Sequence, residues 1–453
     1  MDVHPRLSRR LLVRALATFS FRSRAEDKDA LTALLHPILR VGGGGMAPSE
    51  QAMLADTFPE KRRSLAFAVY GVAVLVAPTI GPTLGGWLTD TLSWHWIFLI
   101  NAPVGVLSLV LVNWLVTEPE LLERERRERL AGGLRVDWIG LILVALFLGC
   151  LEIVLDKGQE DDWFASNFIV SFASVAAVAF ALFVPWELTH KDPIVDLRLY
   201  SYRALAAASV MMLLIGAILF GTTQLIPQLL QQIYQYSATL SGLALMPGGL
   251  AMLVLMPVVG FLSLSVPVRY LIAGGMVSIA FSMFHMMSLS GTADFSFYAW
   301  ARVFQTIGLP FVFIPITAAS YQGLPPEKTS EASALINVAR NVGGSIGISV
   351  AATVLARGTQ VHQNILAGHL VPSSPQYQEA IRHATAVLTA QGMPPASVPS
   401  AAIGLINQAV VEQSALLAYI DVFRGFAIVA LLLAPLALVL LRAQPRREAR
   451  PAH

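Results

Sequence analysis

Long apolar segments separated by short polar loops dominate this sequence from about residue 39 to residue 442. Each segment is close to the roughly 20 residues that a helix needs to cross a bilayer, and none shows the short alternating pattern of a barrel strand. They span residues 39–56, 65–87, 96–115, 137–155, 167–186, 204–224, 239–262, 268–288, 297–320, 332–356 and 420–442. Only 13% of the residues are charged, against roughly a quarter in a soluble domain. The sequence therefore predicts an all-α membrane protein with about 11 transmembrane helices.

The first 38 residues do not fit this pattern. They contain seven Lys and Arg residues and no uncharged run long enough to span a membrane. A cleaved targeting peptide is disfavoured because the basic start lacks an apolar core and a cleavage site. We interpret residues 1–38 as a leader outside the membrane fold, which is solvated, disordered or misassigned.

The loops between the spans alternate in charge. Those on one side of the membrane carry seventeen Lys and Arg residues, many of them within 116–136 and 443–453, whereas those on the other side carry three. Because loops rich in Lys and Arg stay in the cytoplasm, this asymmetry predicts a cytoplasmic C-terminal tail at 443–453 and a charged cytoplasmic loop at 116–136. The segment 358–415 is then an outward loop, whose amphipathic middle suits a surface cap or a docking element.

One span contains an unusual run of Pro and Gly. Two prolines and three glycines occupy ten residues, in the order Ala77, Pro78, Gly81, Pro82, Gly85 and Gly86. In water a proline inside a helix costs roughly 3 kcal/mol, but in a membrane neighbouring helices and trapped water satisfy the freed carbonyls. Ala77, Gly81 and Gly85 lie four residues apart and share one helix face, where another backbone can approach closely. An ordinary helix-packing face and a bent helix beside a cavity both remain open.

A short sequence repeat divides the chain. Residues 58–64 and 324–330 share a Pro-Glu-Lys core, and each leads into a Gly-rich span. Same-orientation repeats of this kind build the two halves of several transporter folds. We therefore expect a remnant of an N-terminal bundle at 39–115, an inserted pair of spans at 137–186, and a C-terminal six-helix bundle at 187–442 that includes the outward loop.

Few polar side chains lie inside the spans, and an ionisable group there is costly enough to suggest a function. Arg302 lies about one turn into its span with Gln305 on the same helix face; in the alternative, Arg302 extends to the outer membrane surface. A polar group at the outward end of another span faces either a substrate cavity or the wet rim of the helix, and it consists of Thr222, Thr223, Gln224 and Gln228. Asn341 lies midway along its span and is a further candidate for the transport path.

Enzymatic chemistry has no support in the sequence. We find no metal-ligand spacing and no grouping of Ser, His and Asp for nucleophilic catalysis, and the single cysteine is Cys150. Residues 42–45 are four glycines without the Lys-Ser/Thr pair of a phosphate-binding loop, so ATP-driven transport is not supported. The arginines form no single basic face, which disfavours nucleic-acid binding. We expect no enzyme activity, no metal and no cofactor.

The Pro/Gly run and the residues after it resemble a family pattern. Ala77-Pro78-x-x-Gly81-Pro82-x-x-Gly85-Gly86, followed by the aromatic-rich run 94–105, resembles the antiporter motif and following helix of the major facilitator superfamily, in its fourteen-span EmrB/QacA drug:proton antiporter branch. The similarity extends through residues 155–163, 193–197, 227–231 and 323–327. It covers the chain from about Gly42 to the C-terminus.

The resemblance implies two six-helix bundles with two extra helices between them, and alternating access driven by proton return across a bacterial inner membrane. It implies that Arg302-x-x-Gln305 is the second-half counterpart of the family's Arg-x-x-Gln-Gly element, and it adds Asn101 to the candidate transport path. It also implies small amphipathic substrates. A periplasmic membrane-fusion adaptor and an outer-membrane channel are the implied protein partners, on the side of the loop 358–415.

The sequence departs from the family pattern near its start. The eleven spans correspond to family spans 4 to 14, so the first three, with the acidic residue thought to couple protons, are missing from the pattern. Arg40 is followed by no glutamine, and Leu264 stands where an aspartate is expected. We therefore expect a multidrug efflux transporter that exports amphipathic compounds in exchange for protons but is impaired as written. The alternative is a non-transporting truncated membrane protein or a partner-dependent fragment.

Overall fold

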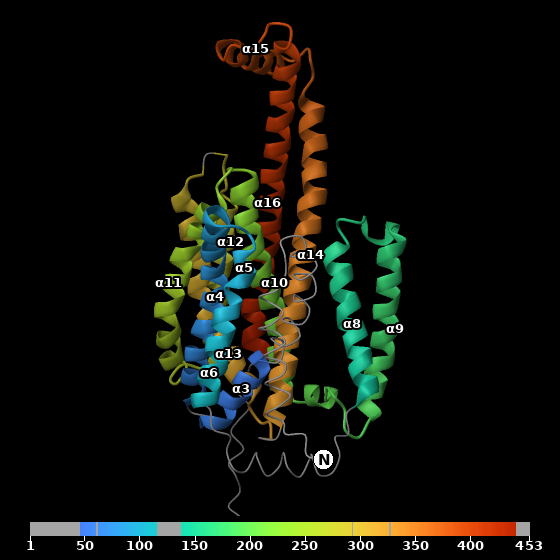
Figure 1. Ribbon diagram of the computed structural model, residues 1–453, viewed down its shortest axis with the longest axis vertical. Helices are drawn as coiled ribbons and strands as arrows, with labels where there is room; N and C mark the ends of the chain where they lie inside the picture. Colours follow the sequence, from blue (N-terminus) through green and yellow to red (C-terminus); the bar gives the residue numbers. More distant parts are fainter. Residues whose placement is uncertain (1–45, 60–61, 116–136, 292, 326–327, 441–453) are drawn as a thin grey trace, which may run out of the picture.

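The computed structural model describes residues 46–59, 62–115, 137–291, 293–325 and 328–440, and the regular elements among them are all helices (Figure 1). The α-helices are α3 (Met46–Thr57), α4 (Arg63–Thr91), α5 (Trp96–Leu99), α6 (Asn101–Leu115), α8 (Trp138–Lys157), α9 (Asn167–Thr189), α10 (Arg203–Gln232), α11 (Ala238–Leu262), α12 (Val268–Met286), α13 (Phe295–Ser320), α14 (Thr329–His369), α15 (Pro375–Ala390) and α16 (Val398–Leu440). Two 3₁₀ helices, η2 (Trp163–Ala165) and η3 (Leu197–Ser201), follow α8 and α9. The predicted leader 1–38, charged loop 116–136 and tail 443–453 lie outside the described residues.

Eight helices of the described part are long and apolar enough to cross a membrane, namely α8 to α14 and α16. They coincide with the last eight predicted spans. Helix α3, helix α4 and the pair α5 and α6 occupy the first three predicted spans. The predicted all-α, multi-pass membrane protein is therefore confirmed.

Helices α10 to α14 and α16 pack around a common apolar core. α10 lies along α14, and α12 contacts both α13 and α16. Large side chains such as Met283, Phe313 and Phe423 fill the centre and are at most 2% exposed. Helix α4 joins this bundle chiefly through α11, so one helix of the segment 39–115 is fixed directly to the C-terminal helices.

The helices α8 and α9 pack against one another and stand beside α14, apart from the other helices (Figure 1). Their apolar side chains remain largely uncovered; Ile142, Val178 and Leu182 are each more than half exposed. An apolar surface of this extent is stable when it faces lipid. The pair lies where the sequence predicts two inserted spans.

Helices α14 and α16 extend far beyond the spans predicted for them. They contain 41 and 43 residues, so each is roughly 60 Å long at 1.5 Å per residue, about twice the thickness of a hydrocarbon core. Both project past the other helices at one end, where α15 lies crosswise beside α16 (Figure 1). Leu388 of α15 is buried in a small apolar cluster with Val398 and Ala402 of α16. The predicted outward loop 358–415 is therefore largely helical, because α14 and α16 continue past their apolar spans and α15 lies between them in the chain.

The predicted span 96–115 is broken into α5 and α6 at Ile100. Pro103 has no backbone N–H and cannot donate to the carbonyl of Leu99, which interrupts the helix. The side chain of Asn101 donates to the carbonyl of Ile97 at 3.2 Å. Asn101 thus satisfies a local backbone group at the break.

Candidate functional site

A buried polar cluster joins α13 to α10 inside the C-terminal bundle. Arg302 and Gln305 lie one turn apart on α13, and Nη1 of Arg302 donates to Oε1 of Gln305 at 2.7 Å. Nη2 of Arg302 donates to Oγ1 of Thr223 at 3.1 Å. Nε2 of Gln305 donates to Oγ1 of Thr222 at 2.5 Å. These four side chains form what we call the Arg302 cluster.

Arg302 is fully buried, which excludes the alternative in which it extends to the membrane surface. Its hydrogen-bond partners among the described residues are neutral oxygens, and its Nε has no partner there. Gly248 of α11 makes room for it, since a Cβ on Gly248 would lie 2.7 Å from Cγ of Arg302. Burial of a guanidinium without a carboxylate costs several kcal/mol, so the bundle maintains this charge against a substantial penalty.

Four other predicted transport-path residues lie outside the Arg302 cluster. Two steps along a helix turn a side chain by about 200°, so Gln224 faces away from Thr222 and is exposed. Gln228, one turn further, is half-buried, and Asn341 and Asn101 are exposed on other helices. The structure therefore brings together two of the six residues predicted for the transport path, along with Thr222 and Thr223 from the polar group predicted at the outward end of α10.

A second polar cluster, which was not predicted, joins α3 and α4 to α14. Oε1 of Gln51 accepts hydrogen bonds from Nδ2 of Asn337 at 2.7 Å and from Oγ of Ser333 at 3.1 Å. Tyr70 of α4 hydrogen-bonds to Gln51 and lies within electrostatic reach of Arg340. We call these residues the Gln51 cluster. The four-residue spacing of Ser333 and Asn337 within an apolar span is the sequence signal that identifies one face of it.

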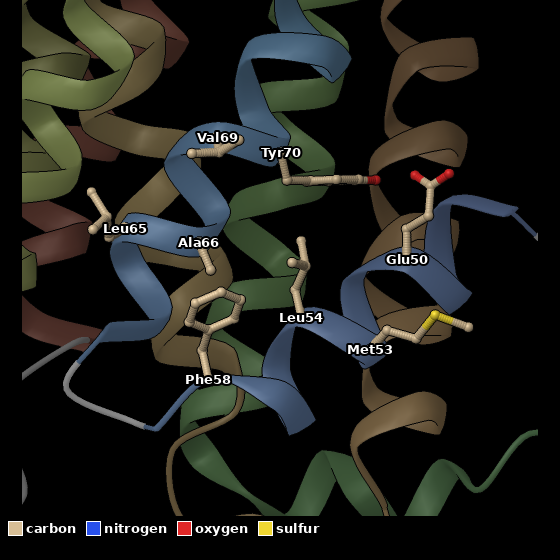
Figure 2. A pocket seen from close by; sticks show the side chains of 8 residues that line it. All are labelled: Glu50, Met53, Leu54, Phe58, Leu65, Ala66, Val69 and Tyr70. Atoms are coloured by element: carbon tan, nitrogen blue, oxygen red, sulfur yellow. The ribbon is translucent and has the colours of Figure 1, made fainter. Parts of the chain in front are cut away.

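An apolar groove of about 490 Å³ lies between α3 and α4, beside the Gln51 cluster (Figure 2). Its lining residues are Glu50, Met53, Leu54, Phe58, Leu65, Ala66, Val69 and Tyr70. Figure 2 shows the Tyr70 side chain directed toward Glu50 at one end of the groove. Apolar walls with a few polar groups at one end are typical of sites for small molecules. Among the described residues, no three His, Cys, Asp or Glu side chains gather as metal ligands.

The Pro/Gly run lies in α4, where Gly86 brings the helix against the start of α11. A Cβ on Gly86 would lie 2.5 Å from a backbone carbonyl of α11, and a Cβ on Gly242 of α11 would overlap the backbone of Thr83. Oγ1 of Thr83 donates to the carbonyl of Gly242 at 2.7 Å. Oδ2 of Asp90 accepts from the backbone N and Oγ1 of Thr239 at 2.9 and 2.6 Å. The run therefore fixes a helix from 39–115 to the C-terminal bundle, backbone against backbone.

The predicted stripe of Ala77, Gly81 and Gly85 does not make this contact. A Cβ added at Gly81 or Gly85 would meet no heavy atom of the described residues within 4 Å. The side chains of Ala77 and Pro78 lie outside the described residues, and Pro82 is half-buried. Successive helical residues are turned by about 100°, and the closest approach falls one position after Gly85, on the neighbouring face.

Comparisons with known proteins give the family. Residues 25–348 match the sequence profile of the Major Facilitator Superfamily, so the match begins inside the segment 1–38. The chain is 35% identical over 355 residues to multidrug export protein EmrB of Haemophilus influenzae, which covers 77% of this chain and 67% of the relative. It is 35% identical over 336 residues to multidrug export protein EmrB of Escherichia coli K12, and the aligned region covers 74% of this chain and 64% of that relative. It is 30% identical over 393 residues to fatty acid resistance protein FarB of Neisseria gonorrhoeae, and the aligned region covers 87% of this chain and 74% of that relative.

The chain spans about two thirds of the length of the EmrB proteins it matches. The matched profile runs from before α3 into α14 and so includes both the Arg302 cluster and the Gln51 cluster. Because the profile covers well over half of the 453 residues and the relatives reach 35% identity, the chain belongs to the major facilitator superfamily.

Proposed function

We propose that this protein is a multidrug efflux transporter that exports amphipathic compounds in exchange for protons. Relatives named multidrug export protein and fatty acid resistance protein support substrates with both apolar and polar parts. The observation that carries the proposal is the Arg302 cluster, in which a fully buried cation is held by neutral partners between two membrane-spanning helices. A charge of this kind inside a membrane helix is costly and marks a functional site.

Arg302 is suited to the control of a proton. A guanidinium stays protonated at physiological pH and is therefore a fixed charge. A fixed positive charge stabilises the ionised form of a carboxyl group that approaches it, and so favours release of that group's proton. In the proposed mechanism, a rocking motion that moves an acidic group toward Arg302 couples proton release to reorientation of the helices.

The groove between α3 and α4 is the proposed place for the apolar part of a substrate. Its walls are apolar, and Glu50 and Tyr70 offer polar contacts at one end (Figure 2). The groove lies next to the Gln51 cluster, which joins the same two helices to α14. A substrate bound in the groove would therefore affect the contact of α3 and α4 with α14.

Efflux from cells that express this chain tests the proposal. Cells without their own drug exporters are loaded with ethidium, and its fluorescence is followed with and without a protonophore. We expect protonophore-sensitive efflux that Arg302→Ala abolishes and that Arg203→Ala, at an exposed position at the start of α10, leaves unchanged. Equal efflux from the two variants would remove Arg302 from the mechanism. No efflux from the unaltered chain, at confirmed membrane levels, would refute transport by this chain alone.

A membrane protein that does not transport by itself is the second candidate. It is favoured by the open space beside Gly81 and Gly85 of α4, where an added Cβ would meet no heavy atom of the described residues within 4 Å. It is also favoured by α6, where Val106 and Leu107 are 60% and 58% exposed. In this case ethidium efflux requires co-expression of a second membrane polypeptide, and efflux from the chain alone rules the candidate out.

We also propose that the C-terminus is cytoplasmic and that α15 projects on the opposite, periplasmic side. The loops on the side where α14 begins carry most of the Lys and Arg, which favours this orientation. The helical projection is then the proposed contact for a membrane-fusion adaptor, which with an outer-membrane channel completes the export path. A fluorescent protein fused to the C-terminus should fluoresce and alkaline phosphatase fused there should be inactive; the reverse result contradicts the orientation.

A further inference from the structure

The junction between the α8–α9 pair and the bundle contains two buried carboxyl groups. Asp137 caps α8, where its Oδ1 accepts from the backbone N of Gly140 at 2.9 Å and from Nε1 of Trp186 at 3.0 Å. Glu187 follows Trp186 in α9 and is 0% exposed. Its Oε2 accepts from the backbone N of Val195 at 3.1 Å. The two groups therefore connect α8, α9 and the segment that leads to α10.

The two carboxyl groups meet at Gly140. A Cβ added at Gly140 would overlap both Oδ2 of Asp137 and Oε1 of Glu187, so only a glycine leaves room for both oxygens. The oxygens are thus separated by roughly 5 Å or less, a distance at which one negative charge disfavours ionisation of the other. Asp137 is only 9% exposed, so water does little to screen the repulsion.

Within the part of the chain that the structure describes, one oxygen of this pair has no hydrogen-bond donor. Oδ2 of Asp137 accepts from Nε1 of Trp186 at 3.1 Å, and the other oxygens have the donors given above. Oε1 of Glu187 is buried and has no partner among the described residues. If Glu187 is protonated at this oxygen, Oε1 becomes a donor, and Oδ2 of Asp137 is an acceptor beside it. Buried polar groups are nearly always hydrogen-bonded, and a single proton meets that requirement.

No described cation bonds to either carboxyl group. Among the described residues, His190 and Asp196 are the other titratable groups that face Glu187. Lys328, at the start of α14, is bonded at 3.1 Å to Asp196. The guanidinium of Arg198 donates to two backbone carbonyls. Lys328 and Arg198 thus bond to other groups, and no hydrogen bond in the described part of the chain joins the His190 ring to either carboxyl group. Of the charges that the described residues leave available, a proton is therefore the positive charge that fits between the two oxygens.

We propose that Asp137 and Glu187 bind one proton between them, carried by Oε1 of Glu187 and donated to Oδ2 of Asp137. The bound proton fastens α8 to α9 and, through Val195, holds the segment that connects α9 to α10. Release of the proton leaves two negative charges in a site with little water, and their repulsion loosens the junction. This proton site is distinct from the Arg302 cluster and does not depend on the proposed transport.

Infrared difference spectroscopy of the purified full chain in detergent tests the proposal, because a protonated carboxyl group has a C=O stretching band that a carboxylate lacks. The sample is titrated from neutral to alkaline pH, and tryptophan fluorescence is followed in parallel because Trp186 bonds to Asp137. We expect the wild-type band to disappear in one alkaline step, with a coincident fluorescence change. In Glu187→Gln the amide can donate to Asp137, so the fold should persist while the band and the step are both lost.

Two further variants complete the test. Asp161→Asn removes an exposed acid at the other end of the α8–α9 pair and should leave both signals unchanged. Asp137→Asn keeps a capping side chain but removes the neighbouring charge, so the alkaline step should move to lower pH by about one unit or more. The proposal is overturned if Glu187→Gln retains the wild-type band and step, or if the step of Asp137→Asn coincides with that of the wild type.

Discussion

Three glycines hold α10 and α14 in backbone contact, and their replacement leads to a quantitative prediction. A Cβ added at Gly343 of α14 would overlap the carbonyl oxygen of Leu213, and one added at Gly347 would overlap that of Ala217. A Cβ added at Gly216 of α10 would likewise overlap the carbonyl oxygen of Arg340 in α14. These obstacles are backbone atoms of packed helices, so they cannot rotate aside as a flexible side chain does. Gly343→Ala must therefore push the two helices apart.

The size of the effect follows from two opposing contributions. Alanine is favoured over glycine inside a helix by roughly 0.5–1 kcal/mol. Forcing an extra methyl group into a fitted contact costs roughly 1–3 kcal/mol. For Gly343→Ala we expect a net loss of about 1–2 kcal/mol in the free energy of unfolding. Gly368→Ala lies on the same helix, and its Cβ would meet no described heavy atom within 4 Å, so this variant should be unchanged or gain up to about 1 kcal/mol.

The assay is the unfolding of the purified wild type and variants in mixed micelles with increasing dodecyl sulfate, followed by circular dichroism. Gly343→Ala should unfold at a lower dodecyl sulfate fraction than the wild type, whereas Gly368→Ala should not. Gly347→Ala tests the same contact one turn further along α14. If Gly343→Ala proves as stable as Gly368→Ala, close backbone contact is not what holds α10 against α14, and the reasoning fails.

Substitutions at three further contacts are tested by the same unfolding assay. Gln305→Leu removes a hydrogen-bond partner of the buried guanidinium and should cost about 1–3 kcal/mol; an unchanged stability would mean that this bond is not made. Gly86→Ala should weaken the contact of α4 with α11, whereas Gly85→Ala, which adds a methyl group in open space, should not; equal effects would contradict the assigned face. The hydrogen bond to Glu331 raises the pKa of Lys328, so its contribution to stability is complete at neutral pH and is lost as the pH rises through the raised pKa. Lys328→Met should therefore lower stability at neutral pH by up to about 1 kcal/mol, and a loss that grows with rising pH would contradict this sign.

The positions of the spans follow from hydropathy, because a bilayer demands apolar runs of a fixed length. The ends of the helices do not follow from it. Helix α14 continues from the predicted end at residue 356 to His369, and α16 begins at Val398, more than 20 residues before its predicted span at 420–442. A helix persists beyond the membrane where its residues favour it and a neighbour packs against it. The contact between α14 and α16 supplies that neighbour and leaves no trace in hydropathy.

Arg302 was predictable because a lone cation stands out in an apolar span. Its partners on α10 lie about 80 residues earlier, and only the packing of α10 against α13 brings them near. Helical periodicity places Thr222 and Gln224 on different faces of α10. Thr222 shares one buried face with Leu225 and Leu229. Which face points inward depends on the tertiary contact, so the sequence predicts Gln224 beside Thr222 as a cavity-facing residue although Gln224 is exposed.

The pair α10 and α14 contributes to both polar clusters. α10 supplies two threonines to the Arg302 cluster, and α14 supplies Ser333 and Asn337 to the Gln51 cluster. The glycine contacts hold these two helices backbone to backbone, and packed contacts of this kind switch between discrete arrangements instead of deforming gradually. A movement that separates α14 from α3 breaks the hydrogen bond between Gln51 and Asn337 and carries α10 along, which shifts the threonines relative to α13. The surroundings of the buried Arg302 charge are thereby tied to the contact between α3 and α14, and the proposed exchange of a substrate for a proton requires a connection of this kind.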